Sequence, residues 1–67
     1  MFTLTIKTDG AAFSTADGNP DAYSRDREIA ILLRKVARRL EDGCGLVEIE
    51  TILDTNGNTV GKWEVKD

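Results

Sequence analysis

The sequence predicts an α+β fold in which a single helix packs on a three-stranded antiparallel sheet. Residues 2–7 alternate strictly between apolar and polar side chains, as in a half-buried strand. Residues 24–42 place apolar side chains at helical spacing, and two further strand patterns, 46–54 and 58–65, flank a turn. The expected order is therefore β-α-β-β, within one small domain that spans residues 1–67.

The helix predicted over residues 24–42 supplies the apolar face that the sheet needs as a partner. Ser24 is the preferred N-cap, with Asp21 as its competitor, and Gly43 is the expected C′ residue that ends the helix. The apolar positions follow the i, i+3, i+4, i+7 spacing of one buried helical face. They are Ile29, Leu32, Leu33, Val36, Ala37 and Leu40.

A long connection, residues 9–23, joins the first strand to the helix. Loops of this length are uncommon inside small domains. Its only large apolar side chains are Phe13 and Tyr23. We expect Phe13 to tuck over the edge of the core and anchor the loop. The alternative is an exposed aromatic contact for a partner.

The C-terminal hairpin is expected to turn at residues 54–58. Their sequence, Asp-Thr-Asn-Gly-Asn, suits a three-residue loop, a type I turn followed by Gly57 in the left-handed conformation as a bulge. A two-residue Asn-Gly turn is the alternative, but it would set Trp63 opposite Glu50 and mix polar and apolar side chains on each face. Because one buried face specifies register strongly, we prefer the three-residue loop.

The preferred register assigns each hairpin side chain to a face of the sheet. It sets Ile52 opposite Val60 and Ile49 opposite Trp63, so that Ile52 and Val60 lie on the outer face, away from the helix. The third strand is expected between the other two, in the spatial order 1-3-2, with a right-handed crossover over the helix. The residues expected to share the buried face are Val47, Ile49, Leu53, Trp63 and Val65.

Composition excludes several ways of stabilising so small a domain. The 67 residues include one cysteine and no histidine, which excludes an internal disulfide and disfavours a metal cluster. No apolar run reaches the roughly 20 residues of a membrane span. We expect Cys44 to be buried at a strand entrance, and a single free thiol is typical of the cytoplasm. Oligomerisation is left as a source of additional buried surface.

The sequence offers no credible set of residues for catalysis or for a cofactor. The single thiol has no histidine to act as its base, so we expect no enzymatic activity. Asp17, Asn19 and Asp21, with Glu28 at the twelfth position, have the spacing of calcium ligands. Position six is Ala22, where such loops need glycine, and we therefore expect no bound metal.

Basic side chains are concentrated on the predicted helix. The net charge is −3, yet residues 25–42 hold six of the nine basic side chains. They form a ridge on the side away from the apolar face, and we expect this ridge to bind an acidic protein partner. The net negative charge disfavours nucleic acid as a partner. The basic ridge consists of Arg27, Ile31, Arg34, Lys35 and Arg38.

The outer face of the sheet is the second expected contact surface. Ile52 and Val60 would form a small apolar centre there, and such a patch is self-complementary. We therefore expect a homodimer, formed through this face or through the exposed edge of the strand at 46–54. No membrane partner is expected.

Several segments of the chain combine into a recognisable pattern. The opening Phe-Thr-Leu-Thr-Ile-Lys-Thr-Asp is followed by Ala-Ala-Phe, the helix contains Ile-Ala-Ile-Leu-Leu-Arg, and the close reads Asp-Thr-Asn-Gly-Asn-Thr-Val-Gly. With these motifs nearly the whole chain resembles a set of short phage and prophage proteins of unassigned function. The resemblance implies a phage or mobile-element context and action in the host cytoplasm, and it implies no catalytic residues.

The function that these patterns favour is a non-catalytic protein-interaction module that binds a host or phage protein. One alternative is an inhibitor of a host defence complex of the CRISPR type. Another is a nucleic-acid-binding accessory protein that uses the basic face of the helix.

Overall fold

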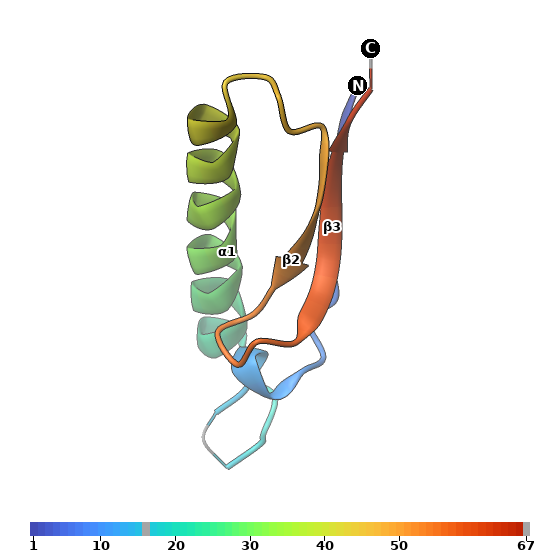
Figure 1. Cartoon of the computed structure of the whole chain (residues 1–67). Helices are drawn as coiled ribbons and strands as arrows, with labels where there is room; N and C mark the ends of the chain where they lie inside the picture. Colours follow the sequence, from blue (N-terminus) through green and yellow to red (C-terminus); the bar gives the residue numbers. More distant parts are fainter. Residues whose placement is uncertain (16, 67) are drawn as a thin grey trace.

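The computed structural model describes residues 1–15 and 17–66, and it contains one helix packed along one face of a three-stranded sheet (Figure 1). The strands are β1 (Phe2–Ile6), β2 (Ile49–Leu53) and β3 (Thr59–Val65), and the helix α1 covers Ala22–Gly43. Every neighbouring pair is antiparallel, in the spatial order β1-β3-β2. The predicted α+β class, β-α-β-β order and central third strand are therefore confirmed.

The core lies between α1 and the sheet and is closed at one end by a short 3₁₀ helix, η1 (Ala11–Phe13). Phe13 is buried, with 2% of its surface exposed, which confirms its predicted role as the anchor of the long loop. Trp63 and Leu32 are the largest fully buried side chains. The six buried apolar residues are Phe13, Leu32, Val36, Ile52, Val60 and Trp63.

The hairpin turn has the predicted conformation. The Asp54 N–H donates to the Asn58 carbonyl at 2.9 Å, the Gly57 N–H donates to the Asp54 carbonyl at 3.0 Å, and Gly57 has φ +83°. The Asp54 carboxylate oxygen Oδ1 also accepts from the N–H groups of Asn56 and Asn58, at 2.9 Å each. Buried Asp54 therefore holds the turn closed with its own side chain.

The predicted hairpin register is wrong, because a second irregularity follows the turn. Leu53 pairs with Thr59, but Ile52 pairs with Gly61, so Val60 is an extra residue on β3. Beyond this bulge Glu50, and not Ile49, lies opposite Trp63. The turn is therefore the predicted three-residue loop. Beyond the bulge, however, the two strands pair in the register that a two-residue turn would have produced.

This bulge reverses the predicted faces of the hairpin. Ile52 and Val60 are 4% and 8% exposed and belong to the core, whereas both were expected on the outer face. Ile49 and Leu53, expected in the core, are 57% and 50% exposed. Because side chains alternate along a strand, a shift of one residue exchanges the two faces of β2.

Gly61 explains why the bulge falls where it does. A Cβ atom at this position would lie 1.8 Å from the carbonyl oxygen of Thr5 in β1. Only glycine allows β1 to approach the central strand this closely beside the bulged residue. The glycine inside an otherwise regular strand pattern was the sequence signal for this bulge.

The ends of α1 also differ from the prediction. Asp21 is the N-cap, and the helix begins at Ala22, one turn earlier than a Ser24 cap would place it. At the other end Gly43 is still helical, and Cys44 takes the left-handed conformation with φ 50°. Cys44 is exposed, so the expectation of a buried cysteine is wrong. Leu33 is also largely exposed, because the buried face centres on Leu32 and Val36.

Two polar contacts hold α1 against the hairpin. The Thr55 N–H donates to Glu28 Oε2 at 3.0 Å, and the Thr55 hydroxyl donates to Glu28 Oε1 at 3.3 Å. One turn from the other end, the Arg39 guanidinium pairs with the Glu50 carboxylate at 2.8 Å. Glu28 is buried and its bond partners lie in the hairpin turn, so this contact fixes the rotation of the helix about its axis.

Candidate protein-interaction surface

The three arginines of the basic ridge lie along the side of α1 that faces away from the core. Leu32 and Val36 mark the buried side of the helix, and each residue advances about 100° around the axis. Arg34 and Arg38 therefore project roughly opposite the core and are exposed. From Arg27 to Arg38 the ridge extends about 16 Å along the helix.

Most of the ridge charges are not engaged within the molecule. Among the residues that the structure describes, Arg27, Arg34 and Lys35 make no ion pair. Arg38 approaches Asp42 at 3.9 Å, but both side chains are exposed and such pairs contribute little. Arg39, by contrast, is held at the sheet by Glu50 and belongs to the fold.

Tyr23 extends this surface by one helical turn. It precedes Arg27 by four residues on α1, so the two side chains lie on the same side of the helix. Its side chain is 76% exposed. Sequence analysis placed Tyr23 in the loop because it placed the helix start at Ser24. The sequence signal for the earlier helix start is Asp21, because an aspartate three positions before Ser24 can cap the helix by accepting from the Ser24 N–H.

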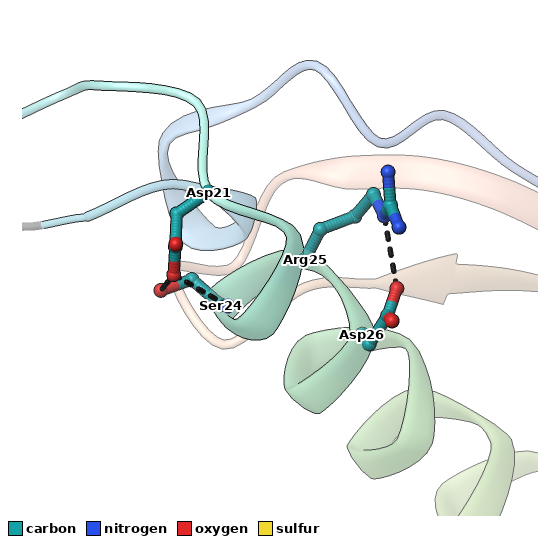
Figure 2. Close-up of polar contacts among 4 residues, drawn as sticks. All are labelled: Asp21, Ser24, Arg25 and Asp26. Atoms are coloured by element: carbon teal, nitrogen blue, oxygen red, sulfur yellow. Dashed lines mark hydrogen bonds and ion pairs between the residues drawn. The ribbon is translucent and has the colours of Figure 1, made fainter.

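The N-cap that positions Tyr23 is drawn in Figure 2. Asp21 Oδ2 accepts from the Ser24 N–H at 2.9 Å and from the Ser24 hydroxyl at 2.8 Å. The backbone bond, and then the hydroxyl bond, lower the pKa of Asp21 below its ordinary value. In the next turn the Arg25 guanidinium points to the adjacent Asp26, at 2.9 Å (Figure 2), and not to the ridge.

Ile31 is more buried than the three arginines of the ridge, and Lys35 lies to one side of them. Ile31 is half-buried beside a hollow of about 280 Å³ between α1, η1 and the hairpin turn, which Arg27 also lines. Lys35 lies toward β2, beside a second hollow of about 350 Å³ that Arg39 and Glu50 also line. The exposed residues of this surface are Tyr23, Arg27, Arg34 and Arg38.

Ile52 and Val60 are excluded from any surface site because both are core residues. The apolar side chains on the outer face are instead Ile49 and Leu53 of β2. Sequence analysis missed this pair because it missed the bulge at Val60.

The acidic side chains with calcium spacing have other partners. Asp21 caps α1 and Glu28 binds Thr55. In the described ranges 1–15 and 17–66, no three acidic or thiol side chains converge to hold a metal ion. Buried Glu28 and Asp54 both accept backbone N–H bonds, which is a structural arrangement.

Comparison with known proteins found no match: no protein-family model fits the chain, and neither the curated proteins nor the solved structures gave a significant resemblance. No helix in the described part of the chain is long and apolar enough to cross a membrane. The features of the molecule that bear on function are therefore the surface of α1 and the sequence motifs.

Proposed function

We propose that this chain is a non-catalytic protein-interaction module that docks the exposed ridge of α1 onto an acidic surface of a host or phage protein. The observation that carries the proposal is the row of Tyr23, Arg27, Arg34 and Arg38 on one side of a firmly capped helix. Tyrosine and arginine are the residue types that dominate the binding energy of protein interfaces.

The distribution of charge favours a compact protein partner over DNA. The ridge is positive, but the remainder of a chain with net charge −3 is more acidic than basic. A long polyanion would extend beyond the ridge and meet this negative field within the Debye length of about 8 Å. An acidic patch of limited size avoids that repulsion, and Tyr23 offers it a planar contact that a phosphate backbone does not need.

We infer the setting of this interaction from the resemblance of the sequence motifs to those of short phage proteins. A phage-encoded module would act in the host cytoplasm, where an exposed free thiol such as Cys44 stays reduced. A host defence complex is one partner of this kind.

A charge-reversal pair tests the proposal. The chain is used to retrieve its partner from a lysate of the native host, and association with the purified partner is measured against salt concentration. The double variant Arg34→Glu/Arg38→Glu should associate about tenfold more slowly or worse, because steering by the ridge is reversed. Its free energy of unfolding should change by no more than about 0.5 kcal/mol, since both side chains are exposed.

The matched control is Lys7→Glu/Lys66→Glu, which changes the net charge equally but lies outside α1. It should associate almost as fast as the parent chain. Equal slowing by both variants would mean that net charge, not the ridge, controls association. Salt-sensitive binding to duplex DNA that the ridge variant abolishes would replace this proposal by a nucleic-acid function.

A further inference from the structure

The outer edge of β2 is an unoccupied strand edge. Within residues 1–15 and 17–66, β2 pairs with β3 alone. The Val65 N–H donates to the Glu48 carbonyl at 2.7 Å, which makes Glu48 and Val65 a hydrogen-bonded pair of the ladder. Since bonded pairs alternate in antiparallel sheets, Glu50 and Ile52 direct their backbone groups to β3. The backbone groups of Ile49, Thr51 and Leu53 therefore point outward.

The same three residues also expose their side chains on the outer face of the sheet. Ile49 and Leu53 are more than half and about half exposed, and Thr51 between them is exposed as well. Proteins usually protect such an edge with lysine, proline or a bulge. The strand Ile-Glu-Thr-Ile-Leu contains neither lysine nor proline, and the bulge at Val60 lies on β3. Its one charged residue, Glu50, is on the face toward α1 and is paired with Arg39.

The other free edge of the sheet differs in chemistry. On β1 the outer face carries Thr3 and Thr5, and the strand is followed by Lys7. The apolar residues of β1 point instead toward α1. On the outer face, exposed apolar side chains and free backbone groups thus coincide at β2 and not at β1, where the half-exposed Phe2 lies on the face toward α1.

We propose that β2 pairs with β2 of a second copy of this chain, antiparallel and about a two-fold axis at Thr51, to form a continuous six-stranded sheet. This register places Ile49 opposite Leu53 of the second copy, on each side of the axis, and Thr51 opposite itself. All three positions have outward backbone groups, so each facing pair exchanges two N–H···O=C bonds. The pairs on the outer face are apolar or hydroxyl pairs, which stabilise antiparallel strands.

The register favours a second copy over a strand of another protein because it is self-complementary. A two-fold interface requires that each residue meet a suitable partner when the chain is rotated onto itself. Ile49 with Leu53 meets this condition, and Glu50, already paired with Arg39, faces Ile52. If the pairing of the two copies continued beyond β2, Glu48 would lie opposite Asp54. Because these two carboxylates repel each other, the pairing ends with the strand.

The small size of the contact determines how strong the dimer is. A five-residue strand buries less than the roughly 1,200 Å² of a standard interface, so the dimer is weak and forms toward millimolar concentration. Both copies place Lys35 on this side of α1, so added salt screens the repulsion between the two lysines and does not weaken the dimer. This response is opposite to that of partner binding through the ridge.

Thr51→Lys and Thr5→Lys form a matched pair of test variants. Both residues are exposed and both flank Lys62 of the central strand, so each substitution adds the same repulsion within one chain. Only Thr51→Lys sets two lysines opposite each other across the two-fold axis. In sedimentation equilibrium the parent chain and Thr5→Lys should form dimers with similar dissociation constants, and Thr51→Lys should raise the constant about tenfold or more.

Two further measurements keep the test decisive. Trp63 fluorescence verifies that each variant is folded. If Thr51→Lys does not fold, Thr51→Pro takes its place, since the Thr51 N–H points outward and its loss removes no bond to β3. A parent chain that stays monomeric toward millimolar concentration overturns the proposal. So does a dimer that Thr51→Pro leaves intact, or one that Thr5→Lys weakens as much as Thr51→Lys.

Discussion

The two ends of this small domain are held together very differently. At the hairpin end, η1, the turn at residues 54–58 and the first half of α1 are joined by buried Phe13 and by the bonds from Thr55 to Glu28 (Figure 1). At the open end, residues 43–48 connect α1 to β2 beside the two termini, and Leu46 is almost fully exposed.

From this contrast we expect the stability of the fold to be concentrated at the hairpin end. Long-range polar bonds and complete burial coincide where the loop, the helix and the turn meet. At the open end the apolar residues Phe2, Leu40 and Val47 are only partly covered. Local opening should therefore begin at residues 43–48 and reach the hairpin end last.

The largest expected effect comes from one residue type tested at both ends of β2. Ile52→Ala, at the hairpin end, should lower the free energy of unfolding by about 2–5 kcal/mol, because it removes buried methyl groups and leaves a cavity. Ile49→Ala, at the open end, should lower it by about 1 kcal/mol or less, because Ile49 is mostly exposed. Urea denaturation at micromolar concentration, where we expect the chain to be monomeric, measures the free energy of unfolding of both variants. Equal decreases for the two variants would contradict the observed register.

A smaller effect is expected from the contact between α1 and the turn. Glu28→Ala removes the buried, charged acceptor of the Thr55 N–H and should lower the free energy of unfolding by about 1–3 kcal/mol. Glu41→Ala is the control, the same change at an exposed position near the open end of α1, with an expected effect within about 0.5 kcal/mol. If the two variants melt alike, the Glu28 contact does not distinguish the two ends.

The smallest effect concerns pH and the cap of α1. Hydrogen bonds from Ser24 lower the pKa of Asp21 in the folded chain, so the carboxylate stabilises the fold above the ordinary aspartate pKa of about 3.9. That contribution is lost as the pH falls through the lowered folded pKa. Asp21→Asn should therefore be less stable than the parent chain near neutrality, and the gap should close in strong acid. Melting curves at several pH values check this, and a gap that widens in acid would exclude the carboxylate as its source.

How far the sequence predicts this molecule depends on which interactions determine each feature. Helical periodicity and alternating strands are local patterns, and so is the turn chemistry of Asp54 and Gly57, so the element order and the turn could be predicted. The bulge at Val60 could not be predicted from the hairpin alone, because it depends on β1 approaching Gly61 from the other side. Ile52 lies in the core in place of Ile49 because the approach of β1 to Gly61 determines where the bulge falls.

The residues of the exposed ridge also divide into those that the local sequence predicts and those that it does not. Arg27, Arg34 and Arg38 could be placed from helical spacing, because surface positions on a helix need no partner. Tyr23 could not, because its place depends on the competition between Asp21 and Ser24 for the cap. The structure resolves that competition by letting the Ser24 N–H and hydroxyl both donate to Asp21.

The pairing of the two termini has a mechanical consequence. Phe2 lies opposite Val65 at the end of the ladder between β1 and β3, and the Lys66 N–H donates to the Met1 carbonyl at 2.9 Å. A force that pulls the two ends apart acts across this ladder at its first rung, and it breaks the bonds one after another instead of all together. The chain should therefore unzip at low force, so that an unfolding motor drawing on either terminus would meet its main resistance only at the hairpin end.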